Sequence, residues 1–163
     1  DNISEEELAG MLYENSDEPY CEELAKAITN EIRRGNRIDT TTKLRNVIEK
    51  TLDFLPNNKE KKDIIKKTCQ RTFQALRIDV NNEFEVLYEF MEKLPGALKP
   101  GGRVAILTFH SGEDKLVKKA LKAGYKEGIY SEYARDVVRP SAQECAQNGR
   151  ARSTKMRWAV KAE

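Results

Sequence analysis

Polar and apolar positions follow a helical period through the first third of the chain. Ser4-Glu5-Glu6-Glu7 has the residues of a capping box, which predicts that a helix begins here. The apolar spacing of residues 24–32, before Gly35, predicts a second helix, and candidate caps at 39–41 predict a third. Pro56-Asn57-Asn58 then interrupts the pattern. This part of the chain is therefore predicted to be helical throughout.

A longer apolar stripe follows in the middle of the chain. Its residues recur at spacings of four and three, which places them on one face of a helix: Val80, Phe84, Leu87, Met91 and Leu94. The stripe predicts one long helix over about residues 74–94, with this face in the core. Turn residues at 95–96 and 100–102 punctuate the connection after it.

The pattern changes to extended structure after these turns. Residues 103–109 form a largely apolar, β-favouring run of strand length, which predicts a strand buried on both faces. Ser111 comes next as a candidate N-cap, and an apolar side then runs to Gly124, so a tight turn and a helix follow the strand. Two more extended segments are predicted, at 136–139 and at 155–162. In the second, alternating apolar and basic residues indicate a strand with one face buried.

The end of the strand at 103–109 is the first candidate for chemistry. In open α/β sheets ligands bind at the carboxyl ends of strands, so Phe109, His110 and Ser111 are candidate cleft residues. The alternative is structural: His110, the only histidine, caps the turn, and Ser111 caps the helix. A Ser-His hydrolase is not favoured, because adjacent strand positions point to opposite sides and no G-x-S-x-G motif is present. Residues 99–103 precede the strand and lack the Gly-Lys-Ser/Thr ending of a phosphate loop, so we interpret them as a turn.

Charge is distributed unevenly along the 163 residues, a length that fits one domain or a compact domain with an appendage. Residues 1–30 hold nine acids and one lysine, whereas residues 133–163 hold seven Lys or Arg and three acids. The basic tail is the candidate for meeting a polyanion, and a solvated charged surface is the alternative. Within it, residues 139–141 and 148–153 supply guanidinium and hydroxyl groups of the kind that bind phosphates.

Composition disfavours several other classes. No apolar run approaches the ~18 residues of a membrane-spanning helix, and the first residues lack the pattern of a signal peptide. The three cysteines lie far apart and include no C-x-x-C pair, so neither a disulfide framework nor a metal site is indicated. We expect reduced thiols in a cytoplasmic protein with no membrane partner.

Four stretches, in one order along the chain, resemble a known family. They are RTFQALRIDVNNEF (71–84), PGGRVAILTFHSGEDKLVKK (100–119), RPSAQE (139–144) and NGRARSTKMRWAV (148–160). Together they resemble the bacterial MraW/RsmH family of S-adenosylmethionine-dependent methyltransferases, which modify the exocyclic N4 amine of a cytidine in small-subunit (16S) ribosomal RNA. The acidic opening and RIDTTTKL (37–44) also resemble that family's helical insertion.

The resemblance implies an α/β fold that is incomplete in this chain. Family members are longer and begin with strands and a glycine-rich loop that hold S-adenosylmethionine, and nothing here matches those elements. The chain would comprise an all-helical insertion subdomain, residues 1–75, and the C-terminal half of a Rossmann-like methyltransferase domain, residues 76–163, with about three strands in a mixed sheet. The main cofactor site is expected upstream of Asp1. Gly112 stands where the family usually has leucine.

The resemblance also implies roles for particular residues. Catalytic positions would be held by His110, Phe109 and Ser111, with His110 orienting the base or accepting a proton and Phe109 stacking on the base. RNA contacts would come from one helical face and from the basic tail: Arg71, Gln74, Arg77, Asn81, Arg139, Ser141, Arg150, Arg152 and Lys155.

The implied partners are ribosomal RNA and the small ribosomal subunit. Because the strand at 103–109 would lack its parallel neighbour, we expect the chain to form a homodimer or to pair with the missing N-terminal segment. The alternative function is a non-catalytic RNA-binding or assembly module that retains half of the fold.

Overall fold

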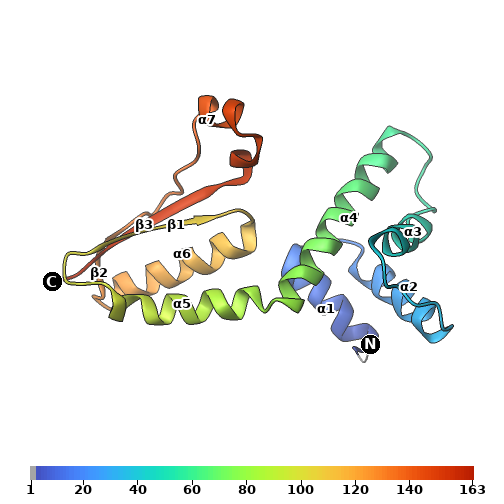
Figure 1. Ribbon diagram of the computed structural model, residues 1–163, viewed down its shortest axis with the longest axis horizontal. Helices are drawn as coiled ribbons and strands as arrows, with labels where there is room; N and C mark the ends of the chain where they lie inside the picture. The colour runs from blue at the N-terminus through green and yellow to red at the C-terminus, as the bar shows by residue number, and fades with distance from the viewer. Residues whose placement is uncertain (1–2) are drawn as a thin grey trace. The chain divides into compact units, whose positions relative to one another are not determined.

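The computed structural model describes residues 3–163, which form two compact units. The first unit ends at Asn82 and contains helices only, and the second, Glu83–Glu163, contains helices and a sheet (Figure 1). We call them the helical unit and the α/β unit. The expected boundary between residues 75 and 76 lies within a helix. The division of the chain into an insertion and a catalytic half stays a prediction. In the part of the chain that the structure describes, every helix is too short or too polar to cross a membrane.

Four helices make up the helical unit: α1 (Glu5–Ser16), α2 (Cys21–Arg33), α3 (Thr41–Thr51) and α4 (Lys59–Val80). A polar side chain caps the start of α1, α3 and α4, at Ser4, Thr40 and Asn58 respectively. The capping box at Ser4 is confirmed, since its hydroxyl accepts from the Glu7 N–H at 3.1 Å and its own N–H donates to the Glu7 carboxylate at 2.8 Å. The predicted helices of this part are therefore present.

The core of the helical unit is one apolar cluster to which all four helices contribute. Leu12, Leu24, Ile48 and Ala75 represent the four helices in it, and each is fully buried. Each of the four helices therefore turns an apolar face toward this common core.

The single long helix expected over residues 74–94 is wrong, because the structure has two helices there. α4 ends at Val80, and α5 (Glu83–Ala97) begins after Asn82, whose backbone has a left-handed φ of 49°. Asparagine tolerates this conformation better than most residues, so a pair of asparagines is a suitable helix stop. The stripe is divided accordingly: Met91 and Leu94 are buried, whereas Val80 is 79% exposed.

The α/β unit contains a three-stranded sheet with helices on one side. Its remaining elements are β1 (Arg103–Thr108), α6 (Ser111–Lys126), β2 (Tyr130–Tyr133), α7 (Ala142–Gln147), a short 3-10 helix η1 (Gly149–Ser153) and β3 (Lys155–Lys161). Helices α5 and α6 lie on the same side of the sheet (Figure 1). They enclose a compact apolar core with the strands: Met91, Leu94, Val117, Leu121, Tyr130 and Ala159.

The sheet has the order β1-β3-β2, and both pairings are antiparallel. The expectation of about three strands is confirmed, and β3 lies between β1 and β2. The expectation of a mixed sheet is wrong, because residues 3–163 contain no parallel pair in it. Residues 130–133 supply the third strand, whereas 136–139 contribute only an isolated bridge between Val138 and Met156. The assignment to half of a Rossmann-like sheet stays a prediction.

One face of the sheet carries exposed apolar side chains. Val104 and Ile106 of β1 pack against the core, whereas Ala105 and Leu107 point to the other side and are exposed. The prediction that this strand is buried on both faces is therefore wrong for this chain. β1 is also an edge strand, so N–H and C=O groups of alternate residues point away from β3.

Candidate functional site

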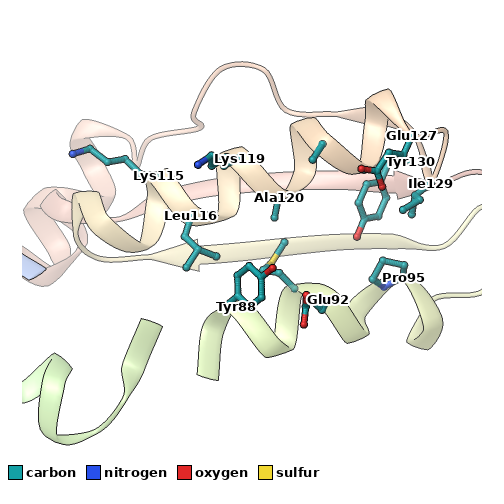
Figure 2. Close-up of a pocket in the computed structure, with 13 residues that line it drawn as sticks. Tyr88, Glu92, Pro95, Lys115, Leu116, Lys119, Ala120, Glu127, Ile129 and Tyr130 are labelled. Atoms are coloured by element: carbon teal, nitrogen blue, oxygen red, sulfur yellow. The ribbon is translucent and has the colours of Figure 1, made fainter. Parts of the chain in front are cut away.

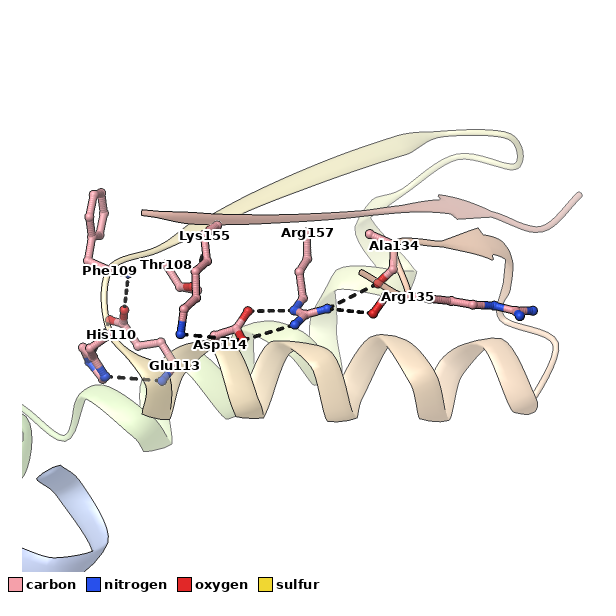
Figure 3. Close-up of polar contacts among 9 residues, drawn as sticks. All are labelled: Thr108, Phe109, His110, Glu113, Asp114, Ala134, Arg135, Lys155 and Arg157. Carbon is pink, nitrogen blue, oxygen red and sulfur yellow. Dashed lines mark hydrogen bonds and ion pairs between the residues drawn. The ribbon is translucent and has the colours of Figure 1, made fainter. Parts of the chain in front are cut away.

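The turn between β1 and α6 is built around His110. Its backbone is extended (φ −137°, ψ 165°), and its Nδ1 accepts a hydrogen bond from the Glu113 N–H at 3.4 Å, which makes it the N-cap of α6. The Glu113 carboxylate reaches back and accepts from the Phe109 N–H at 3.0 Å (Figure 3). The expected N-cap at Ser111 is wrong, because Ser111 is already the first residue of the helix. The structural role of His110, which sequence reasoning left open, is thus observed at the carboxyl end of β1.

The His110 ring is packed, with 12% of its side chain exposed. It meets the ring of Phe84 edge to face, with centroids 5.8 Å apart and an interplanar angle of 64°. A Cβ at Gly112 would lie 2.6 Å from Phe84 Cζ, so glycine at this position makes room for the Phe84 ring. The departure from leucine noted in the sequence therefore accompanies a specific local packing.

Phe109 is the exposed member of the turn. Its ring is 56% exposed and points away from α6 (Figure 3). Ser111 is exposed as well, at the first turn of α6. The three candidate catalytic residues thus share one turn, and the aromatic ring is the part of that turn presented to solvent. Their catalytic roles stay predictions.

Glu83, His110 and Glu113 form a group whose potential metal-ligand atoms all lie within 4.8 Å of one another. The hydrogen bond to Nδ1 requires that nitrogen to be an acceptor, so a neutral His110 ring carries its proton on Nε2. Nε2 lies 3.3 Å from Glu113 Oε1, which is close enough for an ion pair when the ring is protonated. In this arrangement His110 acts as a hydrogen-bond acceptor and as the cap of α6.

A buried ion pair fixes the helix that follows the turn. Arg157 of β3 is 5% exposed and holds Asp114 through two bonds, Nε to Oδ1 at 2.7 Å and Nη2 to Oδ2 at 3.2 Å. Its Nη1 also donates to the carbonyl oxygens of Ala134 and Arg135 at 3.4 and 3.3 Å (Figure 3). The hydrogen bond from Arg157 lowers the pKa of the Asp114 carboxyl below its usual range. Arg157 thereby joins β3, α6 and the segment after β2.

Sequence reasoning missed this ion pair. The alternation at 155–162 predicts one buried face, and a basic residue is an unusual occupant of a buried face. The buried side is the one with Arg157 and Ala159, because Asp114 on α6 pairs with the arginine. Lys155 lies on the same side, with its Nζ 4.0 Å from Asp114 Oδ2. The available signal was Asp114, an acid in the first turn of α6.

The candidate RNA-binding residues of α4 belong to the helical unit. Arg71 Nη1 lies 3.3 Å from Oε2 of Glu18, a fully buried carboxylate that also accepts from the Tyr20 N–H at 3.0 Å. Arg71 therefore balances a buried charge. Gln74 is half-buried, and Arg77 and Asn81 are exposed at the end of the helix.

The candidates of the basic tail belong to the α/β unit. Arg139, Arg150 and Arg152 are exposed, the last two on η1. Ser141 caps α7, where its hydroxyl accepts from the Glu144 N–H at 3.1 Å and its N–H donates to the Glu144 carboxylate at 2.7 Å. Lys155 is half-buried beside Asp114. Among these candidates, the three arginines are exposed basic side chains that could meet a phosphate.

Comparison with known proteins identifies relatives along the whole chain. Residues 1–162 match the MraW methylase family. The chain is 88% identical, over its full length, to 46% of "Ribosomal RNA small subunit methyltransferase H 1" of Agathobacter rectalis. It is 71% identical over 98% of its length to a protein of the same name from Lachnoclostridium phytofermentans, and 59% identical over 98% to "Ribosomal RNA small subunit methyltransferase H 2" of Alkaliphilus metalliredigens. The chain covers 43% and 46% of these two proteins, so it spans about half the length of the curated relatives it matches.

Proposed function

The chain belongs to the MraW methylase family, and on that premise we propose that it is part of a methyltransferase that modifies the N4 amine of a cytidine in small-subunit ribosomal RNA. The observation that carries this proposal is the family match over residues 1–162, together with relatives named for small-subunit ribosomal RNA methylation. The methyl donor of such an enzyme would be S-adenosylmethionine.

The residues present do not form a pocket for that cofactor by themselves. A nucleotide-type cofactor is held by a glycine-rich loop after a strand and by an acidic residue further on. Within residues 3–163 the turn after β1 is Phe109-His110, without glycine, and the Gly101-Gly102 pair comes before that strand. We therefore propose that the cofactor site belongs to the part of the full-length protein that this chain does not span.

The proposed contribution of the turn is to the target base. Phe109 offers an exposed ring on which a base can stack, and stacking is worth about 1–3 kcal/mol per base. His110 holds the turn in shape from beneath, through its cap to Glu113 and its contact with Phe84. Arg139, Arg150 and Arg152 would contact RNA phosphates, which position the strand without reading its sequence.

The open side of the sheet supports a proposal about assembly. β1 has apolar side chains on both faces and an unpaired edge, a combination typical of a strand inside a larger sheet. We propose that the remainder of the full-length protein pairs with this edge and covers Ala105 and Leu107. A second copy of this chain is the competing occupant, and it would appear in light scattering as a dimer that dissociates in the Leu107→Lys variant.

The decisive experiment compares methylation and binding in the full-length protein. Phe109→Leu is expected to lower methylation of small-subunit RNA about tenfold, as the loss of one stacked base predicts. The matched control is Phe54→Leu, since Phe54 is 66% exposed in the helical unit and should leave the rate unchanged. Equal rates for both variants would contradict the role of Phe109.

A calorimetric titration separates the enzyme from the binding-module alternative. This chain alone should not bind S-adenosylmethionine, whereas the full-length protein should. A full-length protein that binds ribosomal RNA but no S-adenosylmethionine would overturn the methyltransferase proposal and favour the non-catalytic module.

A further inference from the structure

A groove of about 860 Å³ lies between α5 and α6 in the α/β unit (Figure 2). Its walls are mostly apolar, with Met91 on α5 and Leu116 and Ala120 on α6. This volume is in the range of small-molecule sites, which are lined by apolar groups with a few polar ones to orient the ligand. It lies on the helix layer, and its lining includes none of the candidate catalytic or RNA-binding residues.

One polar group inside the groove points to a ligand. Tyr130 is 3% exposed, and among the described residues its hydroxyl has no hydrogen-bond partner. In Figure 2 this hydroxyl points between the two helices, toward the side of Pro95. An unsatisfied buried hydroxyl is unfavourable, and such groups are uncommon in folded proteins. Burial also raises the pKa of Tyr130, so the group remains a neutral O–H donor at physiological pH.

The position of the Tyr130 ring depends on a glycine of α6. A Cβ at Gly124 would lie 2.6 Å from Tyr130 Cε2, so a glycine within the helix is required for the ring to sit where it does. Glycine there carries a cost of about 1 kcal/mol relative to alanine in helix propensity. The groove is thus shaped by specific residues.

Charged side chains at the rim make one end of the groove basic and the other acidic. Lys115 and Lys119 lie toward the start of α6, whereas Glu127 lies beside Tyr130 at the far end (Figure 2). From Lys115 to Gly124 the helix runs about 13 Å, at ~1.5 Å per residue. An anion is therefore favoured at the lysine end, and a neutral acceptor is favoured next to the Tyr130 hydroxyl.

We propose that this groove binds an elongated amphiphilic molecule with an acidic group at Lys119, an apolar body between α5 and α6, and a neutral carbonyl or ether oxygen that accepts from Tyr130. Glu92 and Glu127 at the rim disfavour a second anionic group. The site is independent of the proposed methyltransferase activity, and either can fail without the other.

The test compares two probes by calorimetry on the full chain. Monomethyl sebacate has a carboxylate at one end and an ester carbonyl at the other, whereas decanoate has the carboxylate alone. The first is expected to bind about fivefold more tightly, as one hydrogen bond to a buried hydroxyl predicts. Tyr130→Phe should abolish this difference and leave decanoate binding unchanged, which also shows that the variant is folded.

Charge is tested by a second pair of variants. Lys119→Gln should weaken both probes about threefold, as expected for one exposed ion pair, whereas Lys122→Gln on the same helix but outside the groove should have no effect. Equal affinity of the two probes for the unmodified chain, or persistence of their difference in Tyr130→Phe, would overturn the proposal. Tighter binding of decylamine than of decanoate would overturn it as well.

Discussion

Among the described residues, the helical unit and the α/β unit each bury one charged side chain with a partner, but they complete their cores differently. In the helical unit, Glu18 is fully buried beside Arg71, and four helices close around a single cluster. In the α/β unit, Arg157 is buried with Asp114, yet the sheet keeps an apolar face and a strand edge open. The helices of the first unit therefore enclose its core. In the second unit, one face of the sheet and the edge of β1 have the surface properties of a strand inside a larger sheet.

The two units can be followed separately. Trp158, the only tryptophan of the chain, lies on β3, so its fluorescence reports unfolding of the α/β unit. Far-UV circular dichroism reports both units, and the helical unit contributes much of the helix signal. This separation is necessary because a chain with two units need not unfold in one step.

The largest effect is expected in the core of the helical unit. Leu24→Ala should destabilise that unit by about 3 kcal/mol, because it removes a fully buried side chain and leaves a cavity. In a urea titration the dichroism transition should shift while the Trp158 transition stays in place. A parallel shift of both transitions would show that the two units unfold as one and would contradict the comparison.

A somewhat smaller effect is expected at the buried ion pair of the α/β unit. Asp114→Asn should cost about 2 kcal/mol, since it weakens two charge-assisted hydrogen bonds and leaves Arg157 buried without its counterion. The Trp158 transition should shift. Asp136→Asn is the control: Asp136 is exposed, and its replacement should leave the transition unchanged.

The same pair predicts how the α/β unit responds to acid. The hydrogen bond from Arg157 lowers the pKa of Asp114 in the folded state, so its contribution is complete above the unfolded value of about 3.9. That contribution is lost as the pH falls below about 4, through the lowered pKa. In Asp114→Asn the Trp158 transition should depend less on pH in this window. An unchanged dependence would show that other carboxyl groups are responsible.

Capping provides a smaller test in each unit. Ser4→Ala should destabilise the helical unit by about 1 kcal/mol, because it removes the side-chain half of the capping box at α1. Ser141→Ala removes the corresponding bond at α7, a short helix without buried residues, and should leave the Trp158 transition unmoved. If Ser141→Ala shifts the Trp158 transition as much as Ser4→Ala shifts the dichroism transition, the cap of α7 stabilises the α/β unit although α7 has no buried residues.

The smallest effect on stability is expected on the open face. Leu107→Ser changes a side chain that is 57% exposed and should alter the unfolding free energy by less than about 0.5 kcal/mol. In the full-length protein the same change should be strongly destabilising if the remainder of the chain covers this face. Equal small effects in both contexts would contradict the proposed covering.

Local signals predicted the elements whose ends are marked by side chains. The capping box at Ser4 is present, and the strands expected at 103–109 and 155–162 appear as β1 (Arg103–Thr108) and β3 (Lys155–Lys161). Asn81-Asn82 was overlooked because the apolar stripe keeps its spacing across the break. β2 was missed because Tyr130-Ser131-Glu132-Tyr133 is short and has few apolar residues, and its place in the sheet comes from pairing with β3.

By itself the sequence determined the family, the first helix with its capping box, the strands β1 and β3, and the turn that carries Phe109 and His110, because these depend on motifs and on neighbours along the chain. Only the tertiary structure decided that His110 caps α6, that Arg157 rather than an apolar residue fills the inner face of β3, and that the Tyr130 hydroxyl lies between α5 and α6. Those outcomes depend on residues that are distant in sequence. Asp114 and Arg157 are separated by more than forty residues in the sequence, so no local pattern predicts their contact.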